Sequence, residues 1–115
     1  MELRERTAVL DRDQLREVTL DDDELMREIL AALVDDTVRQ MVLLDAAIRE
    51  QDATRCKRLA HYSKGACANV GARSAATLLK EIEDKAADRN FPECEAALAR
   101  LAQEVDLLRS EAAAL

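Results

Sequence analysis

The sequence predicts an all-α protein, an antiparallel four-helix bundle with additional short N-terminal helices. Ala and Leu dominate its 115 residues, and only two glycines and one proline are present to interrupt a helix. Val, Ile and Thr are scattered rather than grouped into runs, which argues against strands. Apolar residues recur every three or four positions, the spacing that gives a helix one apolar face. A chain of this length forms a single domain, so we expect one bundle over 1–115 with its core from about 34 to 113.

Two helices are expected in the first half of the chain. Residues 11–18 predict a short leading helix, capped by Asp11 or Asp13. The acidic stretch 19–23 starts the next helix, because carboxylates stabilise the positive end of the helix dipole. The helical pattern then continues to about residue 50. Residues 35–37 either cap a fresh helix or lie inside a continuous one, and the absence of Gly and Pro leaves both possibilities open.

Three further helices follow, each with one apolar stripe. A break at 51–52 precedes a helix that reaches about Asn69, and Gly71 ends or bends this helix. The turn 88–92 separates the last two helices, with Pro92 suited to a first helical position. The stripes consist of Cys56, Leu59, Ala60, Ser63, Cys67 and Val70 in the first of these helices, of Ala75, Leu78, Leu79, Ile82 and Ala86 in the second, and of Cys94, Leu98, Leu101, Val105 and Leu108 in the last.

The charge balance and the short apolar runs exclude several functions. Acidic residues outnumber basic ones 24 to 17, so we expect no nucleic-acid partner. No apolar run approaches the ~20 residues of a membrane span, and residues 1–6 lack the apolar core of a signal peptide. We therefore expect a cytoplasmic protein without a membrane partner. Cys56, Cys67 and Cys94 lie on apolar stripes without metal-ligand spacing, which predicts buried thiols and no metal.

The single histidine, His61, lies in an unusual setting. Residues three and four positions away share its helix face, and these are Lys57, Arg58, Lys64 and Gly65. Three cations and a residue without a side chain thus surround it, although the chain carries a net charge of -7. His61 lies about 200° around the helix from Ser63 on the apolar stripe, so it is directed away from the core. This arrangement is suited to meeting an anion.

The residues around His61 also resemble a known signature. The run His61-Tyr62-Ser63-Lys64-Gly65 resembles the His-x-x-Lys-Gly signature of histidine-containing phosphotransfer (HPt) domains of two-component phosphorelays. The following Ala-Asn-Val-Gly-Ala of 68–72 matches the small-residue stretch that usually comes after it, and the helix spacing fits nearly the whole chain. The resemblance implies that His61 relays a phosphoryl group between receiver-domain aspartates. The partners it implies are receiver domains of hybrid histidine kinases and response regulators.

Each neighbour of His61 has an expected role. Imidazole is a good nucleophile near neutral pH, and the cations favour its neutral, attacking form. Lys64 would stabilise the charge of the phosphoryl group, and Gly65 would give steric access, since Gly inside a helix costs roughly 1 kcal/mol relative to Ala and calls for a reason. Lys57 and Arg58 are assigned to partner docking. Related domains, notably those of chemotaxis kinases, carry a Glu or Gln that orients the histidine, and Glu83 is the candidate; a solvated acid is an equal alternative.

Other functions fit parts of the same sequence pattern. His61 could be an ordinary surface histidine, or the protein could be a helical adaptor that binds receiver or kinase domains without carrying phosphate; such an adaptor would lack the His or Lys of the signature. A kinase-linked phosphoacceptor domain normally belongs to a much longer chain. There is no glycine-rich nucleotide loop, so we expect no enzyme with autonomous kinase activity. We expect a monomer without a cofactor, with Mg²⁺ bound by the partner receiver domain.

Two further expectations concern packing and docking. The position of Ser63 is usually aliphatic in the family, and on the buried stripe its hydroxyl can bond to a backbone carbonyl one turn earlier, so we expect a local packing difference and no loss of phosphotransfer. Receiver docking is expected to use the face of His61 together with exposed apolar residues of the segment 26–33.

Overall fold

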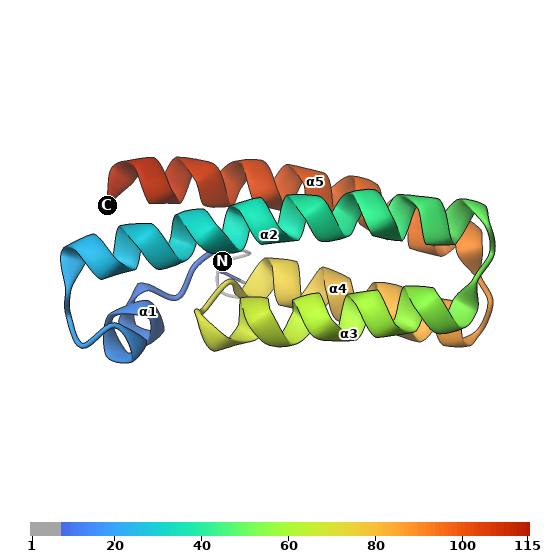
Figure 1. Ribbon diagram of the computed structural model, residues 1–115, viewed down its shortest axis with the longest axis horizontal. Helices are drawn as coiled ribbons and strands as arrows, with labels where there is room; N and C mark the ends of the chain where they lie inside the picture. The colour runs from blue at the N-terminus through green and yellow to red at the C-terminus, as the bar shows by residue number, and fades with distance from the viewer. Residues whose placement is uncertain (1–7) are drawn as a thin grey trace, which may run out of the picture.

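The computed structural model describes residues 8–115 as five helices, and the described residues contain no strand (Figure 1). The helices are α1 (Arg12–Val18), α2 (Asp23–Arg49), α3 (Ala53–Asn69), α4 (Arg73–Ala87) and α5 (Phe91–Ala114). The four long helices run antiparallel, α2 packing on α3 and α5, and α4 also packing on α3 and α5. The predicted all-α bundle is confirmed, with one short leading helix in the described residues. No described helix has the length and apolar character needed to span a membrane.

Polar caps decide where four of the helices begin. In each case the cap side chain accepts a hydrogen bond from the backbone N–H three residues later, a contact that stabilises a helix by about 1 kcal/mol. Asp52 rather than Gln51 is therefore the cap of α3. Pro92 takes the second helical position of α5 rather than the first, because Phe91 already begins the helix. The four caps are Asp11, Asp22, Asp52 and Asn90.

Helix α2 runs without a break through residues 35–37, which answers the question that the sequence left open. Asp35 is exposed and Thr37 is buried, so the two side chains lie on opposite sides of one continuous helix. Thr37 Oγ1 lies 3.9 Å from Cys67 Sγ of α3. This contact joins the middle of α2 to the last turn of α3.

The apolar stripes of the helices meet in one core. Its largest fully buried side chains include Leu15, Leu30, Leu44, Leu79, Ile82, Leu101 and Leu108. The three cysteines are free and buried, as predicted. Loss of hydration raises the pKa of the Cys67 and Cys94 thiols to about 11, so both stay protonated at neutral pH.

Ser63 does not behave as expected. It is buried, and its Oγ has no hydrogen-bond partner among the described residues. The prediction that this hydroxyl bonds to a carbonyl one turn earlier is wrong, because the hydroxyl is buried among apolar core side chains without meeting that carbonyl. A buried unpaired hydroxyl costs about 1–3 kcal/mol, so an aliphatic residue fits this position better.

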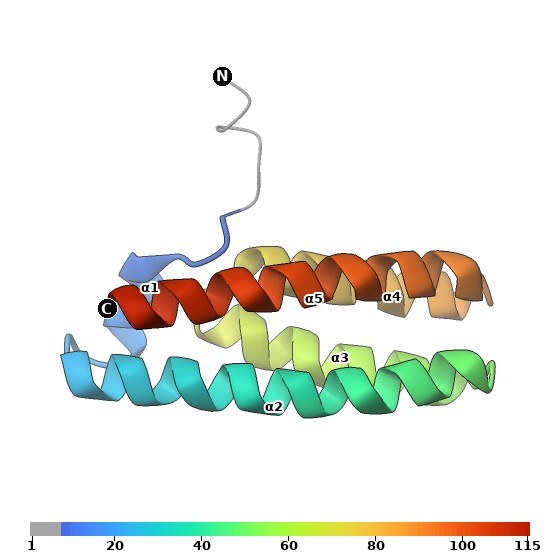
Figure 2. The same ribbon diagram turned by 90° about the horizontal axis from the view of Figure 1, so that it is seen from above.

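Helix α1 closes the end of the bundle at which α3 finishes (Figure 2). Gly71 ends α3 with φ +89°, and its carbonyl accepts a 2.8 Å hydrogen bond from the N–H of Asp11. The Gln14 side chain donates to the carbonyls of Ala68 and Asn69, at 2.6 and 3.2 Å. Carbonyls left free at the end of a helix need such donors. The start of α1 thus anchors the helix that carries His61.

Candidate functional site

His61 occupies the middle of α3 on the side that faces solvent. Its side chain is 69% exposed, whereas Ala60 and Ser63 on the other side of the helix are buried. The 3.6-residue period therefore directs the imidazole outward, as the sequence predicted.

Helix α4 brings a carboxylate to the histidine. Glu83 Oε2 lies 3.0 Å from His61 Nδ1, and Lys64 Nζ donates to Glu83 Oε1 at 2.9 Å. Lys64 and Glu83 are only 25% and 23% exposed, so this carboxylate bridges the two α3 side chains in partly buried surroundings. The sequence left open whether Glu83 contacts the histidine or is an ordinary solvated acid, and in the structure it contacts the histidine.

The protonation of this cluster follows from its charges. Burial raises the pKa of the Glu83 carboxyl, but the hydrogen bonds and charges of Lys64 and then His61 outweigh it, and the pKa is lowered overall. Glu83 is therefore ionised near neutral pH, and an ionised carboxylate can only accept hydrogen bonds. The proton of a neutral His61 ring must then lie on Nδ1, which leaves the lone pair on Nε2.

Gly65, one turn after His61, faces open space. A Cβ built on it would meet no atom within 4 Å, the helix's own nearby backbone aside. The packing of the described chain therefore does not require glycine at this position. The bare backbone leaves room beside the imidazole for another molecule.

The cations that the sequence grouped together fall into two kinds. Lys64 is held by Glu83, as described above. Lys57 and Arg58 are exposed and form no ion pair with any residue in the described range 8–115. Their charges thus remain available one turn before His61, at the place where the sequence predicted partner docking.

Sequence reasoning missed a contact on the other side of α3. Tyr62 donates from Oη to Asp36 Oδ2 of α2 at 3.1 Å, and Arg39 pairs with Asp36 Oδ1 at 3.5 Å. A signal was present, because Tyr62 is the single tyrosine and directly follows the single histidine. The partner Asp36 could not be found without the packing of α2 on α3.

The apolar docking surface expected in the segment 26–33 is smaller than predicted. Met26, Leu30 and Leu33 are buried in the core, Ile29 is half-buried, and only the small residues Ala31 and Ala32 are exposed. The prediction was wrong for the three buried side chains, because α2 is one continuous helix whose early apolar stripe faces the bundle. This segment therefore offers less apolar surface than was expected of it.

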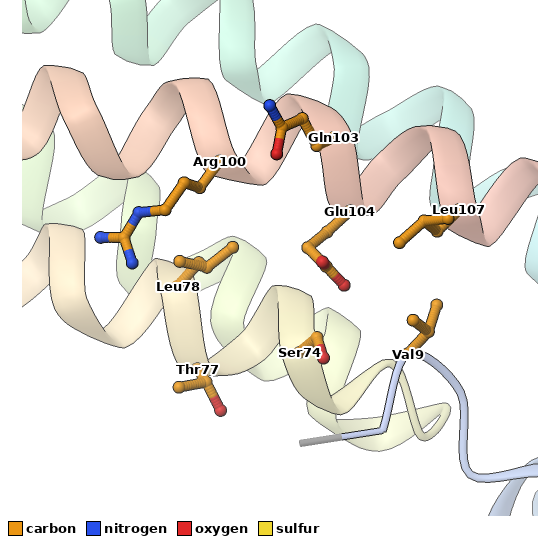
Figure 3. Close-up of a pocket in the computed structure, with 8 residues that line it drawn as sticks. All are labelled: Val9, Ser74, Thr77, Leu78, Arg100, Gln103, Glu104 and Leu107. Atoms are coloured by element: carbon orange, nitrogen blue, oxygen red, sulfur yellow. The ribbon is translucent and has the colours of Figure 1, made fainter. Parts of the chain in front are cut away.

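Two hollows of the surface lie away from His61. One, of about 350 Å³, lies between α4 and α5, where Val9, Ser74, Leu78 and Glu104 approach one another (Figure 3). A second, of about 480 Å³, lies between α2 and α5. Neither takes a lining residue from α3. The described residues contain no group of three or more His, Cys, Asp or Glu that could hold a metal ion.

Comparison with known proteins gives a consistent family. The model of the Hpt domain family matches residues 28–111. Histidine-containing phosphotransfer protein B from Pseudomonas aeruginosa PAO1 superposes with a TM-score of 0.84 at 24% identity, over 93% of each chain. A candidate histidine-containing phosphotransfer protein from rice superposes with a TM-score of 0.82 at 19% identity, over 93% of this chain and 79% of the rice chain.

These two likenesses establish a shared fold. Among curated protein sequences, none matches the chain. The family model, in contrast, covers most of the chain, including all of α3 and α4 with the cluster of His61, Lys64 and Glu83. The chain therefore belongs to the Hpt domain family.

Proposed function

We propose that this protein relays phosphoryl groups in a two-component phosphorelay, with His61 as the phosphoacceptor. His61 would take the group from the aspartate of one receiver domain and pass it to the aspartate of another. The observation that carries the proposal is the exposed imidazole whose Nδ1 is engaged by Glu83 and whose Nε2 carries the free lone pair. Membership of the Hpt domain family supports the class of reaction.

The transfer step is a displacement at phosphorus. The lone pair of Nε2 attacks the phosphorus atom of the aspartyl phosphate, the N–P bond forms, and the P–O bond to the aspartate breaks. The leaving carboxylate keeps the electron pair of that bond. Because Nδ1 retains its proton, the ring acquires positive charge as the N–P bond forms. The Glu83 carboxylate, 3.0 Å from Nδ1, stabilises this charge, and transfer to the second receiver is the reverse step.

Lys64 and Gly65 contribute charge and space. Lys64 lies one turn from His61, where its ammonium group can face the oxygens of the moving phosphoryl group. The receiver presents its aspartyl phosphate in a recess, so the histidine side must allow close approach, and the open space at Gly65 provides it. We expect Mg²⁺ to be bound in the acidic pocket of the receiver and to neutralise charge from that side.

Lys57 and Arg58 favour an acidic partner. Both side chains are exposed, and the pocket of a receiver domain is built around carboxylates, so the two surfaces are complementary in sign. HPt proteins are phosphotransfer intermediates rather than kinases, and we expect the same here: the phosphoryl group comes from a partner and not from ATP.

The test is phosphoryl transfer from a panel of phosphorylated receiver domains to the purified protein. Wild-type protein should gain an acid-labile label from at least one receiver, and His61→Gln should gain none while keeping the same helical circular dichroism. An adaptor that carries no phosphate would bind a receiver without taking up label. Undiminished labelling of His61→Gln would contradict the assignment of the phosphoacceptor.

A further inference from the structure

Tyr62 is an exposed aromatic residue directly beside the histidine. It is 56% exposed, whereas Phe91, the other aromatic residue of the chain, is buried in the core. Large aromatic side chains are usually buried, either in a core or beneath a binding partner, and they dominate the binding energy of many interfaces. An aromatic ring left in solvent next to His61 therefore calls for an explanation.

The ring is held between two helices. Its backbone belongs to α3, and its hydroxyl donates to Asp36 Oδ2 of α2 at 3.1 Å. Asp36 is itself paired with Arg39 on the next turn of α2, at 3.5 Å. The ring thus bridges from α3 to α2 instead of extending freely from one helix. The hydrogen bond to Asp36 also raises the pKa of Tyr62, so the hydroxyl remains a donor at neutral pH.

The hydrogen bond to Asp36 lowers the free-energy cost of burying the Tyr62 ring beneath a binding partner. A tyrosine hydroxyl that loses water without finding a partner is unfavourable, but here the partner is already present within the chain. The bond to Asp36 also restricts the rotamers of the ring before any complex forms, which reduces the entropy lost on binding. A partner can therefore use the ring as an apolar surface without supplying a hydrogen bond to it.

The two sides of His61 differ in polarity, and the Tyr62 ring supplies the apolar side. On the side of α4 the histidine is flanked by the charged pair Lys64 and Glu83, and on the side of α2 it is flanked by Tyr62. The large apolar residues of 26–33 that were expected to supply contact area are mostly buried. The exposed Val42 lines the hollow between α2 and α5, a part of the surface to which α3 contributes nothing.

We infer that Tyr62 is the apolar anchor on which a receiver domain docks when it exchanges a phosphoryl group with His61. We identify the partner as a receiver domain for two reasons. The exposed cations Lys57 and Arg58 of the same helix complement the acidic pocket of a receiver, and the ring adjoins the proposed phosphoacceptor. The inference rests on the proposed function. Tyr62 is a docking residue, which acts on the affinity of the receiver and not on the chemistry at Nε2.

Transfer kinetics separate these two effects. The probe is a phosphorylated receiver domain that labels the wild-type protein, and the rate is measured as a function of its concentration. Tyr62→Ala should raise the half-saturating receiver concentration by about tenfold or more and leave the limiting rate unchanged. Tyr62→Phe, which keeps the ring, should stay within about threefold of wild type. Val42→Ala, a change at another exposed apolar residue that lies between α2 and α5, should have no effect.

The single tyrosine also allows direct observation of the ring. Because the chain has one tyrosine, incorporation of fluorotyrosine gives a single ¹⁹F resonance, which should shift when the unphosphorylated receiver is added. An unchanged half-saturating concentration for Tyr62→Ala would overturn the inference. A lower limiting rate at unchanged half-saturation would overturn it too, since the ring would then act in the chemistry.

A small phosphoryl donor distinguishes failure of this inference from failure of the proposed function. Phosphoramidate needs no protein interface, so it should label His61 equally in wild type and Tyr62→Ala. If both proteins are labelled equally by phosphoramidate and also equally at all receiver concentrations, the anchor is wrong and the phosphoacceptor stands. If neither phosphoramidate nor any receiver labels wild-type protein, the proposed function itself fails and this inference fails with it.

Discussion

Gly65 and Gly71 lie in the same part of the chain, yet the surrounding structure treats them in opposite ways. Gly71 has φ +89°, and a Cβ added to it would lie 2.7 Å from the carbonyl oxygen of Asp11. Gly65 has helical neighbours on both sides, and an added Cβ would meet no atom within 4 Å, the nearby helix backbone aside. The packing of α1 against the end of α3 explains one glycine, and nothing in the described chain explains the other.

The difference separates two reasons for a glycine. At Gly71 the requirement is internal, because left-handed backbone and the close approach of α1 both exclude a side chain. At Gly65 the residue lowers the stability of its own helix by about 0.5–1 kcal/mol relative to Ala. A residue that weakens the protein without a packing reason points to a molecule outside it, and its position one turn from His61 indicates which surface that molecule approaches.

The largest expected effect comes from filling the internal position. Gly71→Ala should lower the free energy of unfolding by about 2–4 kcal/mol, because strain at positive φ adds to the clash with the backbone of Asp11. Gly65→Ala is the matched control and should raise it by about 0.5–1 kcal/mol. Urea denaturation followed by circular dichroism measures both. Equal destabilisation by the two changes would remove the distinction between the two glycines.

A bulky side chain at Gly65 should have a smaller effect, which changes the rate of phosphoryl transfer and not the stability of the fold. Gly65→Leu should slow phosphoryl transfer from a receiver by about tenfold or more, which is about 1.4 kcal/mol, since the side chain occupies the space beside His61. The urea midpoint should not fall, because leucine favours helix over glycine. Labelling by phosphoramidate should be much less affected. Transfer from the receiver at the wild-type rate would show that this space is not used.

The smallest expected effect concerns Lys64, which has both an internal partner and a proposed external one. Lys64→Ala should slow transfer severalfold, while the free energy of unfolding changes by less than about 1 kcal/mol, the usual contribution of a partly exposed ion pair. Lys80→Ala is a suitable control, because Lys80 also pairs with a carboxylate, that of Asp84, in an exposed ion pair within α4. Identical transfer rates for the Lys64 and Lys80 variants would assign Lys64 to stability alone.

Local features of the sequence were enough to predict much of this fold. The helix ends follow from side chains that act on their own backbone, such as Asp11 and Asp52, and from the positive φ that Gly71 permits. The outward direction of His61 follows from the helical period. Such features depend on neighbours within a few positions, so no knowledge of the tertiary structure was needed.

Features that depend on how one helix rotates against another could not be predicted in this way. The contact of Glu83 with His61 was left open, and the bond between Tyr62 and Asp36 was missed, because each joins residues of different helices. The same cause explains the error at 26–33, where the orientation of α2 buries the apolar stripe. The burial of Ser63 was predicted correctly, but its hydroxyl does not form the hydrogen bond that was expected within its own helix.

The three buried thiols can report local unfolding of the bundle. Cys56 and Cys94 lie near the starts of α3 and α5, whereas Cys67 lies near the end of α3 beside Thr37, so the thiols sample both ends of α3. A water-soluble thiol reagent reaches a buried sulfur only while the surrounding helices are apart. The labelling rate of each cysteine, measured by mass spectrometry, would therefore report how often the helices open around that residue. Receiver binding would be detected as a change in these rates.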